Sequence, residues 1–293
     1  MKAGLGKPLS SIVAMLPGPF RLECGSVLAN PVRLAYNTYG ALNAARDNCV
    51  VVGHSLTSNS VVDEWWGPML GVGPRYALDT ARYFIVCVNY IGSCYGSSCP
   101  IDALSHDQAP LMADFPVVSI RDNVRLQRRL LLELGVTRVE LAVGGSLGGM
   151  LALEWGACYC DFVQRIAVIA APALHSGWAI GLGEVGRRAI YADAKWRAGR
   201  YPLDDPPLEG LAVARQLAMI SYRSPASLDS KFGRATAARE VKPRQGSQIL
   251  NHPAVRGASR EQLGGASLVP VTSQDVQRAV QYEVSNCAFA LPA

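Results

Sequence analysis

The sequence is poor in charged residues and lacks long apolar runs. Only 17% of its 293 residues are charged, against about 25% in an average globular domain. With 49% hydrophobic residues, the chain can bury enough apolar surface to offset its ordering entropy, which excludes disorder as its main state. No apolar run reaches about 18 residues, so no membrane-spanning helix is predicted. The length also excludes a small disulfide scaffold and allows one large domain or two ordinary ones.

Metal-site patterns and nucleic-acid patterns are absent too. The chain has 4 His and 8 Cys, but Cys94/Cys99 and Cys158/Cys160 lack zinc-site spacing and no Cys or His pair follows them. The net charge of +5 is spread out, without a basic run interleaved with aromatics. The N-terminus has no proper secretory signal. We therefore predict no metal site, no nucleic-acid or membrane partner, and a reduced, cytoplasmic protein.

Strand-like and helix-like patterns alternate through the first two thirds of the chain. The apolar residues between 119 and 134 fit a helical period, and Gly135 follows as an expected C-terminal cap. This alternation predicts an α/β fold with a mostly parallel sheet and helices on its faces. The expected strands are 32–39, 49–53, 83–89, 138–143 and 165–170, and the expected helices are 119–134 and 147–155.

The pattern then changes twice. Residues 175–233 show helical patterns only, broken by Gly and Pro, which predicts a helical insertion on the sheet. The apolar run 166–174, the longest in the chain, is short and is predicted to be a buried strand. From about residue 236 onward the sequence is rich in Gly, Pro, Ser and Gln without a sustained period, which predicts loop or disorder.

The sharpest motif is the glycine-rich segment GGSLGG at residues 144–149. It follows an expected strand and opens an expected helix, which is the context of a nucleophile elbow. Small residues at Gly144 and Gly148 allow a tight turn that projects the Ser146 hydroxyl at the carboxyl end of the strand. The N–H of Leu147, at the helix N-terminus, can then stabilise a developing oxyanion.

A second motif, GHSLT at residues 53–57, comes just after the buried strand residues 49–52. In proteins with a nucleophile elbow, the second oxyanion N–H comes from a loop after an early strand, and Leu56 is our candidate donor. His54 could be a catalytic base, but its position ahead of the nucleophile favours a structural role.

Taken together, these segments resemble one family, the homoserine O-acetyltransferases of the α/β-hydrolase fold. Fungal relatives that acetylate serine or deacetylcephalosporin C belong to the same group. The combination is more specific than any single motif, and the segment CVNYIGSCYGSSCP is similar to this group in particular. The matching stretches are 21–40, 53–57, 77–100, 114–127, 144–155 and 219–234.

The resemblance implies a domain organisation. An α/β-hydrolase core with the nucleophile elbow would span residues 1–174, and a helical lid would span 175–235. An irregular tail at 236–293 would replace the family's last strands, so the C-terminal part is expected to be truncated or divergent relative to the family.

The resemblance also implies a reaction. Ser146 would attack the thioester of acetyl-CoA, and the N–H groups of Leu56 and Leu147 would hold the oxyanion. The acetyl group would then pass to the hydroxyl of L-homoserine, in methionine biosynthesis. Arg187 lies at the family's carboxylate-binding position, although a surface arginine on a helix is the alternative. Acetyl-CoA is the expected co-substrate, no permanently bound cofactor is expected, and a homodimer is left open.

The expected triad is incomplete in this sequence. A serine nucleophile needs a base and an orienting carboxylate, which in this family follow the lid as an Asp and then a His. Only His175 and His252 follow Ser146, and neither stands in the family's setting. Asp229 belongs to the lid-like segment and Asp275 follows His252, so the Asp and the His are not assigned.

Three further hypotheses therefore stand beside homoserine acetylation. The acceptor could be serine or deacetylcephalosporin C, because all three acceptors offer a hydroxyl and a carboxylate. The protein could be an α/β-hydrolase esterase, in which water takes the acyl group. It could also be a truncated, inactive pseudo-enzyme, since loss of triad members lowers the rate by several powers of ten.

Overall fold

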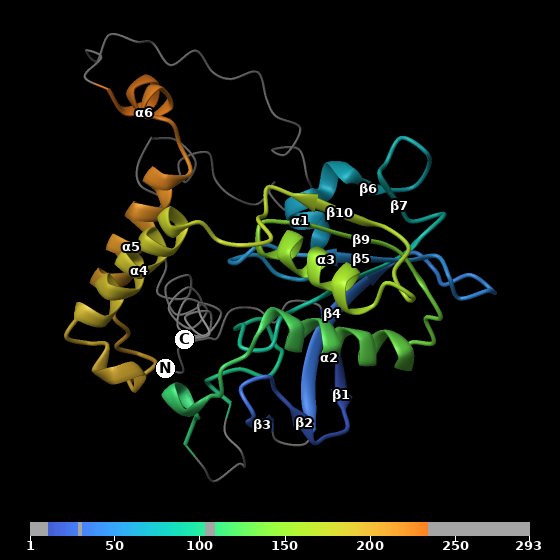
Figure 1. The fold of residues 1–293 in the computed structure, drawn as a ribbon, viewed down its shortest axis with the longest axis horizontal. Coiled ribbons are helices and arrows are strands. Elements are labelled where there is room, and N and C mark those ends of the chain that lie inside the picture. Colours follow the sequence, from blue (N-terminus) through green and yellow to red (C-terminus); the bar gives the residue numbers. More distant parts are fainter. Residues whose placement is uncertain (1–10, 29–30, 103–108, 234–293) are drawn as a thin grey trace, which may run out of the picture.

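The computed structural model describes residues 11–28, 31–102 and 109–233, and its ribbon is shown in Figure 1. The expected tail at 236–293 lies outside the described residues. The strands are β1 Ile12–Leu16, β2 Phe20–Arg21, β3 Val27–Leu28, β4 Val32–Tyr39, β5 Cys49–Gly53, β6 Leu70–Gly71, β7 Leu78–Asp79, β8 Phe84–Val88, β9 Val139–Gly145 and β10 Ile166–Ile169. The helices are α1 Val62–Trp66, α2 Ile120–Glu133, α3 Leu147–Cys158, α4 Gly177–Ala192, α5 Leu208–Ser221 and α6 Pro225–Phe232, with 3-10 turns η1 Gly67–Met69, η2 Met112–Asp114 and η3 Arg197–Gly199.

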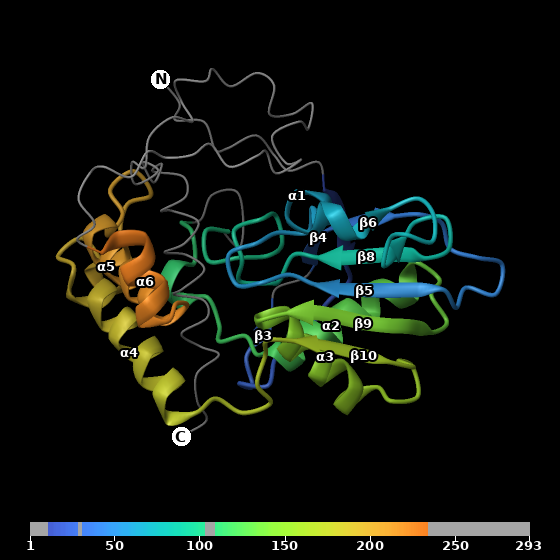
Figure 2. The same ribbon diagram turned by 90° about the horizontal axis from the view of Figure 1, so that it is seen from above.

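The described part of the central sheet has six strands in the order β1-β4-β8-β5-β9-β10. Strands β8, β5, β9 and β10 run parallel, while β4 pairs antiparallel with β8 and with β1. Figure 2 shows α1 on one side of this sheet and α2 and α3 on the other. The predicted α/β fold with a mostly parallel sheet is therefore confirmed. Strand β1 and helix α1 were not predicted, nor were the two-residue strands β2, β3, β6 and β7, which are too short to show a period.

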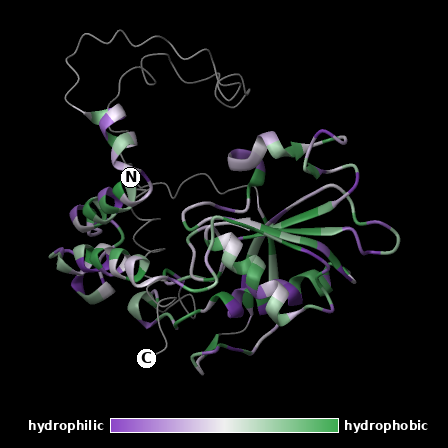
Figure 3. Cartoon of the chain, turned by 45° about the horizontal axis from the view of Figure 1, so that its top comes forward, coloured by the Kyte–Doolittle hydropathy of each residue, from purple (hydrophilic) through white to green (hydrophobic). Residues whose placement is uncertain are grey.

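Strand β5 shows why this sheet needs helices on both faces. Its five residues are all buried. Val51 packs into the core under α2 and α3, while Val50 and Val52 pack into a second core with Val62 of α1. Because successive side chains of a strand point to opposite faces, a continuous run of apolar residues is buried only between two layers. Figure 3 shows the central strands coloured as hydrophobic.

Helix α2 has clear start and stop signals. The Ser119 hydroxyl accepts from the Asp122 N–H, and the Asp122 carboxylate accepts from the Ser119 N–H, which forms a capping box. Gly135 ends the helix with a φ of 82°, a conformation that glycine adopts without strain. The predicted helix and its glycine cap are both present.

Strand β10 differs from its prediction. The run 166–174 was expected to be buried, but Ile166 and Ile169 are 41% and 44% exposed. Among the described strands, β10 pairs only with β9 and forms the edge of the sheet. An edge strand lacks the second neighbour that would cover its apolar side chains.

Helices α4, α5 and α6 form a separate layer, which we call the helical unit. Both views show this unit beyond the carboxyl ends of the parallel strands (Figures 1 and 2). Its own buried cluster is small and consists of Ile190, Tyr201 and Leu211. Within the described ranges, no helix is long and apolar enough to cross a membrane.

Candidate active site

Ser146 lies in the turn between β9 and α3, at the carboxyl end of the strand. Its backbone has φ 56° and ψ −122°, a conformation that costs a non-glycine residue on the order of 1–3 kcal/mol. Its N–H donates to the Ile169 carbonyl at 3.0 Å, which ties the turn to β10. The side chain is exposed. The tight turn therefore places Ser146 at the carboxyl end of β9, the end of the sheet beyond which the helical unit lies.

Three glycines make this turn fit. A Cβ added to Gly148 would lie 2.0 Å from the Gly53 carbonyl oxygen, and a Cβ added to Gly144 would lie 2.3 Å from the Gly148 carbonyl oxygen. Gly53 and Gly144 are register partners at the ends of β5 and β9. The first turn of α3 thus rests directly on two strand ends, and a side chain at any of the three positions would push the turn away. We call this contact of Gly53, Gly144 and Gly148 the glycine crossing.

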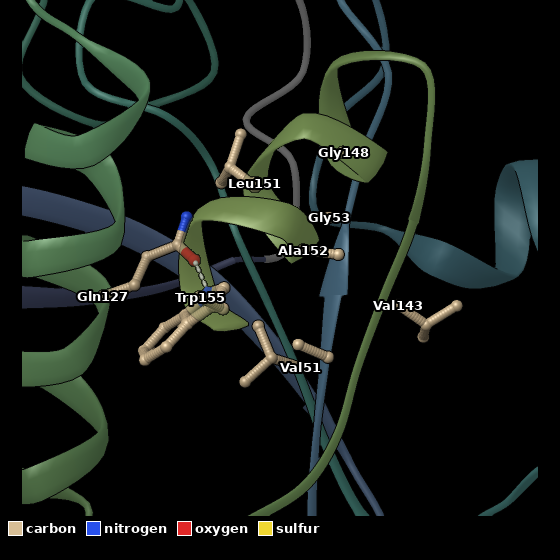
Figure 4. Close-up of a pocket in the computed structure, with 9 residues that line it drawn as sticks. Val51, Gly53, Gln127, Val143, Gly148, Leu151, Ala152 and Trp155 are labelled. Atoms are coloured by element: carbon tan, nitrogen blue, oxygen red, sulfur yellow. Dashed lines mark hydrogen bonds between the residues drawn. The ribbon is translucent and has the colours of Figure 1, made fainter. Parts of the chain in front are cut away.

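Behind this crossing the packing is almost entirely apolar. Figure 4 shows Trp155 and Ala152 of α3 facing Val51 of β5, with the Trp155 indole directed at Gln127. The indole N–H donates to the Gln127 side-chain oxygen at 3.4 Å. No ionisable side chain lines this narrow space, so it belongs to the core that supports the turn rather than to a substrate site.

The two expected oxyanion donors lie on either side of the glycine crossing. Leu147 is the first residue of α3, and Leu56 lies in the loop that follows β5. Within the described ranges, neither N–H donates to a backbone or side-chain acceptor. A free N–H at a helix start and another on a neighbouring loop can hold an oxyanion between them.

His54 is fully buried next to this loop. Its ring stacks on Tyr90 with the centroids 3.9 Å apart, and its Nδ1 lies 2.8 Å from the Ser55 carbonyl oxygen. Burial lowers the pKa of His54 to about 4, because the interior disfavours the charged ring. At neutral pH the ring is therefore uncharged.

The loop after β8 is built around Asn89. The Asn89 side chain accepts from the Ser60 N–H at 2.7 Å and donates to the Tyr95 carbonyl at 2.8 Å. Ser97 donates its hydroxyl to the Asn89 carbonyl at 2.5 Å and accepts from the Ala35 N–H. These buried polar groups satisfy one another's hydrogen bonds. They fix the loop after β8 against β4 and against the loop after β5, which carries Leu56 and which we call the oxyanion loop.

Arg187 lies on α4 in the helical unit. Its Nε and Nη2 both donate to Oε2 of Glu184, at 3.0 and 2.8 Å, and Arg188 donates to the other Glu184 oxygen at 2.8 Å. The Arg187 side chain is 16% exposed, against 77% for Arg188. The hydrogen bonds from Arg188 and Arg187 hold the pKa of Glu184 below its usual value. Within the described residues, Arg187 makes no hydrogen bond to the Ser146 turn.

The other acid and base candidates are scattered. His175 is exposed in the link between β10 and α4, and Asp229 is exposed on α6. His252 and Asp275 lie outside the described residues. The part of the chain that the structure describes also holds no group of three or more His, Cys, Asp or Glu side chains suited to a metal ion.

Sequence reasoning missed two contributors to the site. Gly53 was noted only as the start of a motif, yet its backbone touches Gly148. A glycine ending a buried strand is a signal of close backbone approach, and it could have indicated this crossing. Tyr90, which stacks on His54, carries no such signal, because its contact depends on the fold.

Comparison with known proteins supports the same assignment of fold. A family model described as the α/β hydrolase fold matches residues 48–267. The solved structure of esterase E22 superposes with a TM-score of 0.72 at 25% identity, covering 95% of this chain and 77% of that one.

The curated relatives are more similar in sequence. Homoserine O-acetyltransferase of Trichormus variabilis is 49% identical over 219 residues, which cover 75% of this chain and 60% of that protein. Homoserine O-acetyltransferase FUB5 of Gibberella fujikuroi is 41% identical over 288 residues, covering 93% of this chain and 66% of that protein. The chain thus spans less than two thirds of the length of these relatives. The family model runs through both glycine-lined strand ends and the Ser146 turn, and the chain belongs to the α/β-hydrolase fold family.

Proposed function

We propose that this protein is an acyl-CoA-dependent O-acetyltransferase that moves acetyl from acetyl-CoA to the hydroxyl of L-homoserine. The main support is the 49% and 41% identity to relatives named homoserine O-acetyltransferase. The exposed Ser146 hydroxyl on its strained turn agrees with such a role. The proposal places the reaction in the cytoplasm, in methionine biosynthesis, and leaves a homodimer open.

The proposed chemistry has two steps. The Ser146 hydroxyl loses its proton and adds to the thioester carbonyl, and the tetrahedral intermediate expels CoA as its thiol, leaving acetyl-Ser146. The hydroxyl of homoserine then adds to this ester, and Ser146 leaves with its proton restored. The N–H groups of Leu56 and Leu147 hold the oxyanion in both steps.

The helical unit would act as the lid, as expected for residues 175–235. Arg187 would bind the carboxylate of the acceptor, because a guanidinium can donate two parallel hydrogen bonds to a carboxylate. Glu184 engages only Nε and Nη2 of Arg187. Within the described residues, Nη1 makes no hydrogen bond, so Nη1 and the second N–H of Nη2 can together donate two parallel hydrogen bonds to another carboxylate.

An esterase is the second candidate. The similarity to the esterase E22 structure and the exposure of Ser146 favour it. The two activities differ in whether water is kept from the acyl-enzyme.

The deciding experiment measures thiol release from acetyl-CoA by the full chain, with and without L-homoserine. We expect release that depends on homoserine and yields O-acetylhomoserine. Ser146→Ala should lower this rate by about 10³-fold or more, while Ser230→Ala, at an exposed position on α6, should match the wild type. Thiol release at the same rate without homoserine would support hydrolysis of the acyl-enzyme, and no thiol release at all would refute the acetyltransferase.

A further inference from the structure

The backbone carbonyls that precede Leu56 are held by side chains from one aromatic pair. The Tyr90 hydroxyl donates to the His54 carbonyl oxygen at 2.6 Å, and His54 Nδ1 lies 2.8 Å from the Ser55 carbonyl oxygen. The two rings stack at an interplanar angle of 18°. Two successive carbonyls of the oxyanion loop are therefore fixed, and the next N–H along the chain is that of Leu56.

The contact between His54 and Ser55 defines the tautomer of the ring. A carbonyl oxygen only accepts hydrogen bonds, so Nδ1 must carry the hydrogen. Since the buried ring is neutral at physiological pH, Nε2 is unprotonated. Nε2 is buried and has no hydrogen-bond partner among the described residues. Nδ1 is thus the ring nitrogen of His54 that makes a hydrogen bond, and its partner is the Ser55 carbonyl oxygen.

Fixing the Ser55 carbonyl also fixes the Leu56 N–H. The two groups belong to one planar peptide unit, and in a trans peptide they point in opposite directions. The Ser55–Leu56 bond is not among the cis peptides of the described residues. With its carbonyl turned toward the His54 ring, this peptide must turn the Leu56 N–H away from the ring.

We propose that His54 is a positioning residue, which sets the orientation of the Ser55–Leu56 peptide through its Nδ1–H and so aims the Leu56 N–H at the acyl oxyanion. This inference rests on the proposed function, since it assumes an acyl-enzyme on Ser146. It also accounts for a neutral histidine beside the site that does not act as a base. The Ser55 carbonyl also accepts from the Ser58 N–H at 3.1 Å. Without the Nδ1–H donor this turn bond alone would hold the Ser55 carbonyl, and rotation of the peptide would then remove one oxyanion donor.

Two amide substitutions separate this role from simple packing. The side-chain nitrogen of Asn occupies about the place of His Nδ1, whereas that of Gln reaches about the place of Nε2. His54→Asn should keep the bond to Ser55, while His54→Gln should lose it. Acetylation of Ser146 is measured as the burst of p-nitrophenol from p-nitrophenyl acetate, a probe that needs neither acetyl-CoA nor homoserine. The unfolding midpoint of each variant is measured alongside.

We expect the acetylation rate of His54→Asn to stay within about threefold of the wild type, and that of His54→Gln to fall about 10²- to 10³-fold, the loss typical of one oxyanion donor. The unfolding midpoints of the two variants should be similar. Equal rates for the two variants, or a larger loss for His54→Asn, would overturn the inference. A wild-type burst without acetyl transfer to homoserine would refute the proposed function and leave the positioning role standing.

A readout independent of activity is the nitrogen NMR spectrum of the histidine side chains, with the His54 signal identified by its loss in His54→Asn. The inference predicts a neutral ring protonated on Nδ1 at pH 7. A signal from a ring protonated on Nε2 would overturn it, whatever the rates show.

Discussion

The two ends of the proposed site are built in different ways. At the carboxyl ends of β5 and β9, backbone touches backbone, and three glycines leave no room for a side chain. In the helical unit, the buried cluster has three residues, and the ion pairs of Glu184 with Arg187 and Arg188 lie within α4 itself. Many large apolar side chains of the helical unit are exposed, among them Trp178 and Tyr222. The proposed nucleophile Ser146 is thus positioned by closely packed backbone. Arg187, proposed to bind the acceptor, lies in a layer whose side chains can be substituted with less loss of stability.

We expect the largest effect from a substitution that disrupts the glycine crossing. Gly148→Ala should destabilise the protein by about 4 kcal/mol or more, because the added methyl overlaps backbone atoms that no side-chain rotation can clear. Gly181→Ala, on α4, places its methyl in open space and should stabilise the protein by about 0.5–1 kcal/mol. Denaturant unfolding measures both. If Gly148→Ala unfolds like the wild type, the glycine crossing tolerates an added methyl group as well as α4 does, and the contrast between the two regions is wrong.

The second prediction compares two tryptophans, one in each region. Trp155 on α3 is 1% exposed, whereas Trp178 on α4 is 78% exposed. Trp155→Ala should cost about 3–5 kcal/mol of unfolding free energy through the cavity it leaves. Trp178→Ala should change that free energy by no more than about 0.5 kcal/mol. A large loss for Trp178→Ala would show that its ring is packed in solution.

The smallest expected effect comes from comparing two arginines within the helical unit. Arg187 and Arg188 both bind Glu184, but only Arg187 is mostly buried. Arg187→Lys should raise the KM for homoserine about tenfold to a hundredfold, because lysine cannot donate two parallel hydrogen bonds. Arg188→Lys should leave it unchanged. Steady-state kinetics at saturating acetyl-CoA checks this, and equal KM values for the two variants would remove Arg187 from the acceptor site.

The local elements were predictable because their signals are local. Strands β4 and β5 have the predicted bounds, and α2 agrees within a residue at either end. The strand and helix around Ser146 were also expected, although β9 runs further, through Gly145. The strand pattern of 166–174 was misleading about burial, since exposure of β10 depends on which strands flank it.

The site itself was predictable only in part. Ser146, Leu56 and Leu147 were identified from short motifs, and their catalytic roles stay predictions. The partner of Arg187, Glu184, stands one helical turn away and is typical of helix pairing. The stacking of His54 on Tyr90 joins residues that are distant in sequence, and no spacing rule indicates it.

By itself, the sequence determined the alternation of strands and helices, the tight turn at Ser146 and the buried run of β5. Each of these follows from the conformational preferences and apolar period of a few adjacent residues. Only the tertiary structure decided that Gly53 meets Gly148, that β10 lies at the edge of the described part of the sheet, and that the His54 ring stacks on Tyr90. These depend on contacts between separate segments, whose geometry is set when the sheet and its helices pack together.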